Sequence, residues 1–399
     1  MKCKLTNKDI KPFLSFGKMP LANGFLSENE FKSEFFFDME VGFSEELSLF
    51  QLNDYPKPEQ MFNKKYPFYT GSSNYMNKHF KNYADWLKKE FLKPNSKLIE
   101  IGSNDGTLLS NFKNSTIEYI GFEPSLNVAN KAKENGIQTL NNFFNQNSIN
   151  EIKNFQNKTD VICASNVICH IPNLKDLIAS VDKMLSSNGI FVFEEPYLGS
   201  MFHKVSYDQI YDEHIFIFSI NSIKKIFNLY NFDLIDVLPQ PTHGGSMRYV
   251  IARKNKYTIN DNVNRGISRE NEQNIDNIES CINFKKNCEK SKEKILSSLK
   301  NFKKQGKKIC GYAATSKSTT ILNYCNIDSS IINFICDTTK EKIGKFSPGT
   351  HIPIVSMSHF HKNLPDIAYL FAWNHKEEIL SKEKEFVKKK GKWFSHVAL

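Results

Sequence analysis

A short glycine-containing turn after an apolar stretch constrains the fold of this chain more than any other feature. Residues 97–101 follow an apolar strand pattern and run directly into Gly102-Ser-Asn-Asp-Gly106. A second strand pattern ends at Glu123, 21 residues after Gly102. In doubly wound α/β domains such glycines let the backbone approach a nucleoside, and a carboxylate about 20 residues further on accepts hydrogen bonds from the ribose. The sequence therefore predicts a nucleoside-binding domain, and an ordinary strand-to-helix turn is the alternative.

The spacing of the glycines indicates which nucleoside is bound. It differs from the G-x-G-x-x-G spacing of dinucleotide-binding turns, so a pyrophosphate-bearing dinucleotide is disfavoured. It resembles instead the first motif of class I S-adenosylmethionine (SAM) methyltransferases. The resemblance implies SAM as the cofactor, with contacts from Glu100, Gly102, Asn104, Asp105, Gly106, Glu123 and Pro124.

Further strand and helix patterns define the fold class. Strand patterns alternate with helical ones, which is typical of a parallel sheet with helices on both faces. The last two strand patterns, at 233–238 and 246–252, have no helix between them and should pair as a hairpin. The expected class is α/β: a doubly wound sheet of the class I methyltransferase type that ends in an antiparallel hairpin. Its parallel strands are expected at 97–102, 118–123, 137–141, 160–165 and 189–194.

The chain has 399 residues, more than one core usually holds, so several domains are expected. Residues 1–75 lack strong periodicity and predict a small, loop-rich N-terminal module. The sheet domain occupies 76–255, and the polar stretch 256–300 predicts a connector helix with one packed face. An α/β pattern resumes in 301–399, which predicts a second, smaller Rossmann-like domain.

Composition argues against several classes of function. The net charge of +10 comes almost entirely from Lys, because Arg occupies only positions 248, 253, 265 and 269. A nucleic-acid-binding protein would cluster Arg with aromatic residues, so no nucleic-acid partner is expected. No apolar run is long enough to span a membrane, and the first residues do not resemble a secretory signal. We therefore expect a cytoplasmic protein whose eight cysteines stay reduced.

Two polar clusters follow the fourth and fifth predicted strands, whose carboxyl ends should face the ligand crevice. Asn166 and His170 follow the fourth strand, where cofactor and substrate should meet. Tyr211 and His214 follow the fifth and share a face if the segment is helical. A His with carboxylate neighbours suits a general base, and Glu213 could orient its ring or raise its pKa. A structural role is the alternative for both clusters.

Two other turns suit an anionic substrate. The segment His243-Gly-Gly-Ser-Met-Arg248 lies on the hairpin loop, where glycines permit close approach and Arg248 could bind phosphate or carboxylate. The segment from Gly311 to Lys317 is a strand-to-helix turn whose backbone N–H groups and Lys suit a phosphate. Ordinary structural turns are the alternative in both cases.

The order of these motifs resembles one family along essentially the whole chain: SAM-dependent C-methyltransferases that act on nucleotide-linked deoxy-keto-sugars. The motifs are Pro20-Leu-Ala-Asn23, 100–106, Asn166-Val-Ile-Cys-His170, Tyr211-Asp-Glu-His214, 243–248, 311–317, Pro348-Gly-Thr-His-Ile-Pro353 and Ala372-Trp-Asn374. The resemblance implies that His214 is the base, with Tyr211, Glu213 and His170 close by and Tyr66 or Tyr69 reaching the site. It further implies that the substrate contacts Tyr69, His243, Arg248, Lys317, Asp337, Trp373 and Asn374.

The chain departs from this family at its N-terminus. Members carry two Cys pairs that bind zinc. Here Cys3 remains, Thr6 stands where its partner belongs, and Ser44 and Leu47 replace the second pair. Because zinc needs about four N or S ligands, we expect no structural zinc and no other metal. Aromatic residues such as Phe43 should hold the module instead.

Together these features predict SAM-dependent C-methylation of a nucleotide-diphosphate-linked keto-deoxy-sugar through an enolate formed by His214, as in deoxysugar or polysaccharide biosynthesis. Lys317 and the C-terminal domain would hold the nucleotide end. One alternative is a sugar O-methyltransferase, which needs the same cofactor and base. Another is a methyltransferase-like binding protein without turnover. A monomer and a homodimer are both compatible with the sequence.

Overall fold

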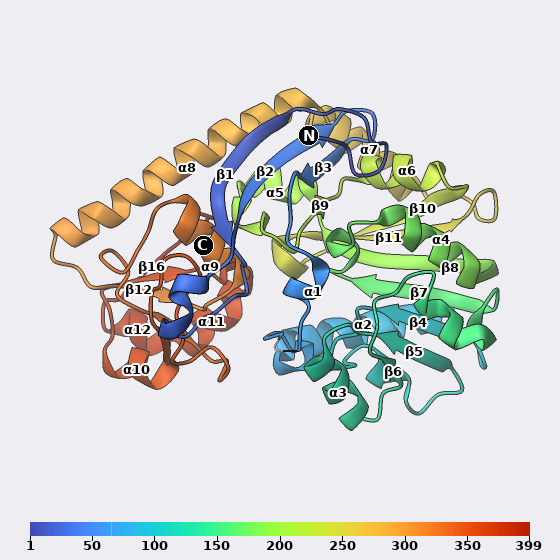
Figure 1. Cartoon of the computed structure of the whole chain (residues 1–399), viewed down its shortest axis with the longest axis horizontal. Coiled ribbons are helices and arrows are strands. Elements are labelled where there is room, and N and C mark those ends of the chain that lie inside the picture. The colour runs from blue at the N-terminus through green and yellow to red at the C-terminus, as the bar shows by residue number, and fades with distance from the viewer. Residues whose placement is uncertain (65) are drawn as a thin grey trace.

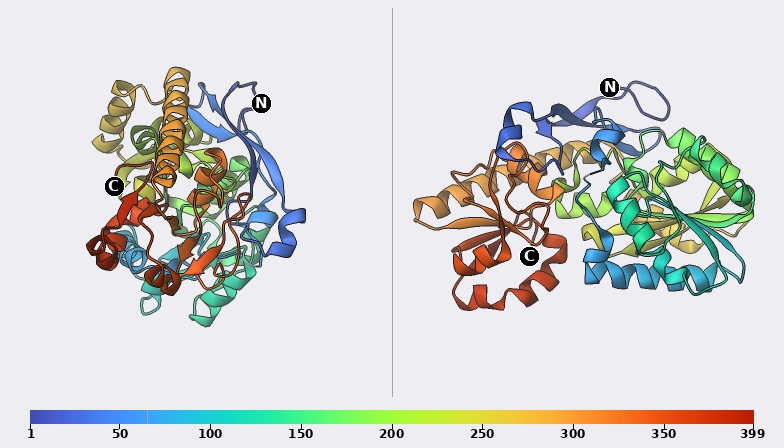
Figure 2. Two further views of the ribbon diagram at one scale, coloured as in Figure 1. Left: turned by 90° about the vertical axis from the view of Figure 1, so that its left-hand side faces the viewer. Right: turned by 60° about the horizontal axis from the view of Figure 1, so that its bottom comes forward.

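The computed structural model describes residues 1–64 and 66–399. Its strands form a seven-stranded, a five-stranded and a four-stranded sheet. The seven-stranded and five-stranded sheets lie in separate lobes, and the N-terminal strands lie across the top of both (Figures 1 and 2). The first of these lobes is called the large lobe below, and the second the small lobe.

The sheet of the large lobe has the order β10-β11-β8-β7-β4-β5-β6. The pairs from β6 to β8 are parallel, whereas β11 pairs antiparallel with both β8 and β10. This arrangement confirms the predicted doubly wound sheet with a terminal hairpin. The strands are β4 (Lys97–Ile101), β5 (Glu118–Phe122), β6 (Thr139–Leu140), β7 (Thr159–Ser165), β8 (Leu185–Pro196), β10 (Phe232–Gln240) and β11 (Ser246–Arg253).

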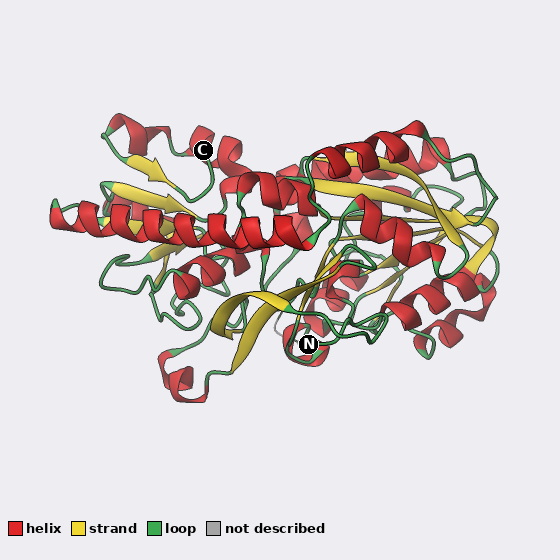
Figure 3. Ribbon diagram, turned by 90° about the horizontal axis from the view of Figure 1, so that it is seen from above, coloured by secondary structure: helices red, strands yellow, loops and turns green. Residues whose placement is uncertain are grey.

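Helices cover both faces of this sheet, because its strands are apolar on both sides (Figure 3). The α-helices are α2 (Asn74–Glu90), α3 (Leu126–Glu134), α4 (Leu174–Met184), α5 (Leu198–Lys204) and α6 (Ile220–Asn228). The 3-10 turns are η3 (Leu109–Phe112), η4 (Ser148–Phe155), η5 (Ile168–His170), η6 (Tyr207–Gln209) and η7 (Thr242–Gly244). The segment between the glycine turn and β5 contains only the short helix η3.

The N-terminal module is built on strands, which the sequence pattern did not reveal. Its sheet has the order β1-β2-β3-β9 and is antiparallel. Alternate residues of β2, from Phe37 to Phe43, are buried, which is the period of a half-buried strand. The strands are β1 (Pro12–Pro20), β2 (Phe36–Ser44), β3 (Leu49–Leu52) and β9 (Phe216–Ile217), with η1 (Glu28–Ser33) at the β1–β2 turn.

The small lobe contains a parallel sheet of the order β14-β13-β12-β15-β16. This is the Rossmann-like arrangement predicted for the C-terminal domain. The strands are β12 (Ile309–Tyr312), β13 (Ile335–Asp337), β14 (Ile354–Ser356), β15 (Ile367–Leu370) and β16 (Lys392–Phe394). The helices are α9 (Ser316–Tyr324), α10 (Met357–Lys362), η8 (Trp373–His375), α11 (Lys376–Lys382) and α12 (Lys384–Lys388).

The expected connector helix is two helices with different partners. The first, α7 (Asp261–Glu272), packs against α6 and β10 of the large lobe. The second, α8 (Ile278–Lys304), runs along the top of the small lobe and packs on β1 (Figure 1). The turn at 273–277 separates them, because two long helical stripes facing different cores cannot lie on one straight helix.

One apolar cluster joins all parts of the chain. It includes Phe50 of the N-terminal sheet, Tyr207 of the large lobe, Phe284 of α8 and Ile335 of the small lobe. The lobes are therefore packed against one another and do not hang on a free linker. Within the described residues, no helix is both long and apolar enough to cross a membrane.

Candidate active site

A cavity of about 350 Å³ opens at the carboxyl edge of the large sheet. Its floor is formed where β4, β5, β7 and β8 end, because the carboxyl ends of parallel strands meet at one edge. The predicted cofactor residues that line it are Glu100, Gly102, Asn104, Glu123, Pro124 and Asn166. The other wall comes from residues 58–62 and 66–70, from Phe143 and Phe144, and from the hairpin residues Thr242, His243 and Ser246.

Glu123 is oriented by the two turns beside it. Its Oε1 accepts the Ser125 N–H at 2.7 Å and its Oε2 accepts the Asn104 N–H at 3.1 Å. Burial nevertheless raises the pKa of Glu123 to about 7, because these two N–H groups only partly replace water. A ligand that donates hydroxyl groups to this carboxylate would stabilise its ionised form.

The charge of the cavity favours a cationic ligand. Burial, and then the neighbouring Asp105 and Glu123, raise the pKa of Glu100 well above its usual value. SAM carries a sulfonium and an ammonium group, which compensate such carboxylates, whereas a dinucleotide pyrophosphate would be repelled. Several buried side-chain atoms on the lining have no partner among the described residues: Glu100 Oε2, Ser103 Oγ, Ser165 Oγ, Asn166 Oδ1 and His170 Nε2. Buried polar atoms normally have partners, so this lining fits a polar nucleoside such as SAM.

Both glycines of the turn are required by space and by conformation. Gly102 has φ +65° and a Cβ there would collide with Val167. Gly106 has φ +80° and a Cβ there would lie 2.6 Å from Ile137. Positive φ values strain other residues, so the glycines at these two positions shape the turn.

The segment that covers the cavity is hydrogen-bonded to the glycine turn at 102–106. The Thr70 N–H donates to Asn104 Oδ1 and the Gly71 N–H donates to Asp105 Oδ2, each at 2.8 Å. Asn104 and Asp105 therefore bind the chain's own covering segment. Asn104 also lines the cavity, whereas the predicted cofactor residues Asp105 and Gly106 lie outside its lining. Tyr69 is also occupied within the fold, since its hydroxyl accepts Asn127 Nδ2 at 2.7 Å.

His214 has a defined tautomer. Its Nδ1 lies 2.7 Å from the Gln209 carbonyl oxygen, which can only accept, so Nδ1 carries the proton. Its Nε2 lies 2.7 Å from the Tyr211 hydroxyl, which then donates to this nitrogen. Burial, followed by the nearby His170 and His243, lowers the pKa of His214 well below its usual value. His214 is thus a neutral base whose lone pair is on Nε2, where it accepts the Tyr211 hydroxyl.

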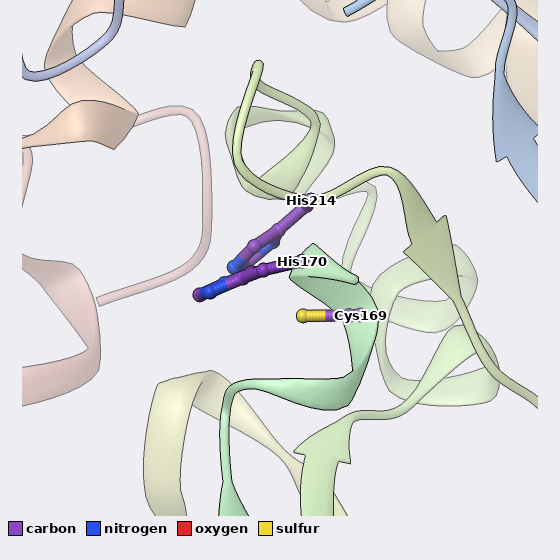
Figure 4. A group of neighbouring side chains, drawn as sticks. All are labelled: Cys169, His170 and His214. Carbon is purple, nitrogen blue, oxygen red and sulfur yellow. The ribbon is translucent and has the colours of Figure 1, made fainter. Parts of the chain in front are cut away.

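His170 stacks on His214 with ring centroids 5.3 Å apart and an angle of 20° between the rings (Figure 4). Burial lowers the pKa of His170 to about 3, so it is neutral. With Cys169 the two rings form the one group of three metal-type ligands found in the described part of the chain. The near-parallel rings direct their in-plane lone pairs side by side, and both nitrogens of His214 already have partners. The geometry therefore suits acid–base chemistry better than metal binding.

Glu213 contacts the segments around Asn23 and Tyr66 rather than the His214 ring. Its Oε1 accepts Asn23 Nδ2 at 2.7 Å and its Oε2 accepts the Tyr66 hydroxyl at 3.2 Å. Burial raises its pKa to about 7. The ring of His214 is oriented by a backbone carbonyl, so the expected orienting role of Glu213 is corrected by the structure. Tyr66 lines the cavity and contacts Glu213, and its role in the reaction stays a prediction.

Arg248 is not available to a substrate phosphate. Its Nε donates to Glu194 Oε1 at 2.7 Å, and its guanidinium carbon lies 4.0 Å and 4.5 Å from the ring centres of Tyr83 and Trp86. The other oxygen of Glu194 lies 2.6 Å from His79 Nε2. The predicted substrate contact is wrong for Arg248, because its side chain points to the face of β11 covered by α2. His243 does line the cavity.

The predicted substrate residues of the small lobe form two groups. Lys317 Nζ lies 3.3 Å from Asn374 Oδ1 and 4.7 Å from the ring centre of Trp373, so these three residues are together. Asp337 is apart from them, and its oxygens accept the Ala314 and Thr339 N–H groups at 2.7 Å each. Asp337 therefore shapes its own turn, and its expected contact with substrate stays a prediction.

Several residues of the site were not found from the sequence. Gln209 acts through its backbone, which leaves no side-chain signature. Glu195 accepts the Val167 and Ile168 N–H groups at 3.0 Å and 2.6 Å and thereby shapes the turn that carries His170. The sequence signal for Glu195 was its position next to Glu194 at the end of a strand. Asp208 and Asn23 become neighbours of the site only through the packing of the lobes.

The chain matches three family models in succession. They are described as a putative zinc binding domain at residues 3–62, a methyltransferase domain at 75–237 and a C-methyltransferase C-terminal domain at 241–398. Among solved structures, magnesium protoporphyrin IX methyltransferase from Synechocystis is 13% identical, with a TM-score of 0.34 over 45% of this chain and 79% of that one. Ribosomal protein L11 methylase from Lactobacillus delbrueckii is 17% identical, with a TM-score of 0.32 over 46% and 80% of the two chains.

The doubly wound sheet, the glycine turn and the matched domain models define a SAM-dependent methyltransferase. Within this class, the chain belongs to the C-methyltransferases that combine the three matched domains. C-methyltransferase NovU from Streptomyces niveus is a relative, 27% identical over 383 residues that make up 95% of this chain and 91% of NovU.

The N-terminal module matches the zinc-binding model, but the residues present do not fit zinc. Cys3 is buried in an apolar cluster with Leu5, Leu47 and Leu49. Gln51 holds the backbone around Cys3, accepting the Lys4 N–H and donating to the Lys2 carbonyl, each at 3.0 Å. The group of metal-type ligands found among the described residues lies elsewhere, at 169–214. Apolar packing around Cys3 and the hydrogen bonds of Gln51 stabilise this turn in the structure.

Proposed function

We propose that this C-methyltransferase acts on a nucleotide-diphosphate-linked keto-deoxy-sugar, at a carbon atom next to the ketone. The observation that carries the proposal is His214, a buried neutral base with its lone pair on Nε2, which stacks on a residue of the SAM-type cavity. Transfer to carbon requires a base that can remove a proton from C–H, and this geometry supplies one.

SAM supplies an electrophilic methyl group when it is bound. Glu123 would accept its ribose hydroxyls, and Glu100 and Asn166, which have unpartnered oxygens on the cavity lining, would meet its polar groups. The covering segment, which contributes Phe62, Tyr66 and Phe68, would limit the access of water to bound SAM. Exclusion of water strengthens each of these polar contacts.

His214 would take the proton of the substrate C–H on Nε2, which leaves the electron pair in an enolate. The enolate carbon then forms the new C–C bond as the carbon–sulfur bond of the methyl donor breaks. Tyr211 now donates its hydroxyl to Nε2 and would turn that hydroxyl to the enolate oxygen. His170, neutral and with an unpartnered Nε2, is the second polar group at this place. Positioned donors of this kind stabilise developing negative charge.

Lys317 would bind the diphosphate of the substrate. It lies beside Trp373 and Asn374, and Lys204 donates to the Gly244 carbonyl close to the same Trp ring. Two cations at the junction of the lobes suit a diphosphate, while the sugar extends toward His214.

The unpaired state of all eight cysteines supports action in the cytoplasm.

Proton exchange tests the base. The protein is incubated in deuterium oxide with S-adenosylhomocysteine and a panel of thymidine-, uridine- and guanosine-diphosphate-linked keto-deoxy-sugars. One of these should exchange its α-proton faster than the background. His214→Ala should abolish the excess exchange and retain cofactor binding, because His214 does not line the cavity. His359→Ala, an exposed His of the small lobe, is the control that should keep both.

The product separates carbon from oxygen methylation. A methyl group on carbon survives demethylating reagents, whereas a methyl ether does not. Finding a methyl ether would overturn the C–H chemistry. Failure to bind SAM would instead support the third reading, a binding protein without turnover.

A further inference from the structure

The small lobe has a ligand crevice of the Rossmann type that is filled by the protein itself. In open α/β sheets, ligands bind outside the carboxyl ends of the strands, where the strand order reverses. In the small lobe β12 lies between β13 and β15, so the order reverses beside β12. The elements that follow β12, β15 and β16 line this edge: α9, η8 and the segment after Phe394.

The group held at this edge is Asp208, which belongs to η6 of the large lobe. Its side chain is fully buried, with 0% exposure. Its Oδ2 accepts the indole N–H of Trp373 at 2.7 Å, and its Oδ1 lies 3.1 Å from His396 Nε2. Trp373 follows β15 and His396 follows β16, so Asp208 stands where an anionic ligand of a Rossmann domain would stand.

The residues on either side of Asp208 are also held by the rest of this junction. The Ile210 carbonyl accepts the Thr320 hydroxyl at 2.9 Å, and Thr320 belongs to α9. The Tyr207 hydroxyl lies 3.5 Å from Cys325 Sγ and 3.4 Å from the Ser291 hydroxyl of α8. The segment 207–210 is therefore anchored on the small lobe at several consecutive positions.

Between these anchored residues lies Gln209, whose carbonyl fixes the Nδ1–H tautomer of His214. The position of this carbonyl decides which nitrogen of the base carries the proton and where Nε2 points. A misplacement of about 1 Å at a reacting group can reduce the rate about 100-fold.

We propose that Asp208 is a positioning residue for His214 and that the small lobe, through Trp373 and His396, holds the base in its active tautomer. The second Rossmann-like domain is thus a part of the catalytic apparatus, and its crevice is occupied by a carboxylate of the same chain. The inference rests on the proposed role of His214 as base. Its first test, however, needs no substrate.

The tautomer is measured by nitrogen NMR of protein labelled with ¹⁵N-histidine. The His214 signals are those missing from His214→Ala. In the wild type they should comprise one protonated and one unprotonated nitrogen that do not average. Asp208→Ala should make the two signals move toward a common value, because the Gln209 carbonyl is no longer held. Trp373→Phe removes only the indole donor and should shift them in the same direction.

Glu383→Ala is the matched control. Glu383 is buried in the small lobe and, like Asp208, bonds an aromatic donor and a His: its oxygens lie 2.9 Å from the Tyr312 hydroxyl and 2.9 Å from His361 Nε2. It has no connection to Gln209, so its loss should leave the His214 signals unchanged. If Asp208→Ala and Trp373→Phe both retain the wild-type signals, the proposal is wrong, whatever the substrate proves to be.

Kinetics give the second readout once a substrate is in hand. Asp208→Ala should lower kcat about 10- to 100-fold while SAM affinity stays within about twofold. Asp208→Asn keeps an oxygen for the Trp373 donor and should restore most of the rate. A loss of kcat equal in Glu383→Ala and Asp208→Ala would show a general effect on the fold and contradict a positioning role.

Discussion

At the scale of single residues, the histidines at the centre of this site are neutral rather than charged. Burial lowers the pKa of His170 and of His243 to about 3 each, and it lowers the pKa of His214 well below its usual range. A base with a lowered pKa remains unprotonated down to acidic pH. The pH dependence of the enzyme should therefore come from the acids around the cofactor rather than from these histidines.

Glu123 gives the first prediction. Its pKa is about 7 in the free protein, and ribose hydroxyls bind its ionised form. Below pH 7 the carboxyl must lose a proton on binding, so SAM affinity should fall by up to about tenfold for each pH unit. Above pH 7 the affinity should level off. Calorimetry between about pH 5.5 and 8 measures this, and Glu123→Gln should weaken binding by about 1.5–3 kcal/mol and remove the pH dependence. Glu118→Gln, an exposed acid of β5, should behave as the wild type.

Tyr211 gives a second prediction. Its hydroxyl is the donor closest to the base, 2.7 Å from His214 Nε2. Tyr211→Phe should lower kcat by roughly 10²–10³, because one donor to the enolate oxygen is lost, and should leave SAM affinity unchanged. Steady-state kinetics and calorimetry on the same preparation measure the two effects. An unchanged kcat would remove Tyr211 from the mechanism.

Single residues also show the limit of sequence reasoning. The glycine turn, Glu123, Asn166 and His170 lie together because one strand edge gathers them, and that edge follows from the strand pattern. Arg248 and Asp337 have the predicted residue type at a loop or strand end, yet their side chains are satisfied within the fold. Whether a buried charge has an internal partner depends on neighbours distant in sequence, which a motif does not contain.

At the scale of elements, β11 and α2 enclose a charged pair. Arg248 and Glu194 have side-chain exposures of 7% and 4%. Arg248→Met should destabilise the protein by about 3–5 kcal/mol, because Glu194 then keeps a buried charge with only His79 beside it. Adding Glu194→Gln should recover part of that loss. Urea unfolding measures both, and equal stability of the single and double variants would contradict the account.

The N-terminal turn is an element for which we expect no metal. Purified protein should contain no stoichiometric zinc, and chelators should not lower its melting temperature. Gln51→Ala should lower the melting temperature, because the Lys4 N–H and the Lys2 carbonyl lose their partner. We expect the free energy of unfolding to fall by about 1–3 kcal/mol. Elemental analysis showing one zinc per chain would contradict this prediction.

The elements differ in how well the pattern predicted them. The parallel strands of the large sheet were expected within a few residues, because continuous apolar runs between helices are distinctive. In the small lobe, the three-residue strands β14 and β16 were missed, because they are too short to show a pattern. The N-terminal strands were missed, because bulges interrupt the pairing of β1 with β2 and disturb the two-residue period. The connector was predicted as one helix, because a stripe of apolar residues at helical spacing does not show where the element it packs against changes.

At the scale of the whole molecule, the N-terminal chain ties the lobes together. The Ala22 N–H donates to Asp212 of the large lobe at 3.1 Å, and the Ala22 carbonyl accepts Thr319 of the small lobe at 2.8 Å. Further along, Glu34 accepts the Gly349 N–H and lies 2.7 Å from His351 Nε2. These contacts connect distant parts of the sequence, so no local pattern could predict them.

The strand β9 limits how such an enzyme can be recombined with a relative. β9 begins two residues after His214 and completes the N-terminal sheet by pairing with β3. A chimaera that exchanges only the first sixty or so residues would place a foreign edge against β9 and a foreign Asn23 loop against Glu213. Substitutions in β3 and in β9 must therefore match each other, and β9 belongs to the segment that carries His214. A functional graft has to exchange the N-terminal strands and residues 206–218 as one unit, although the sequence separates them by more than a hundred positions.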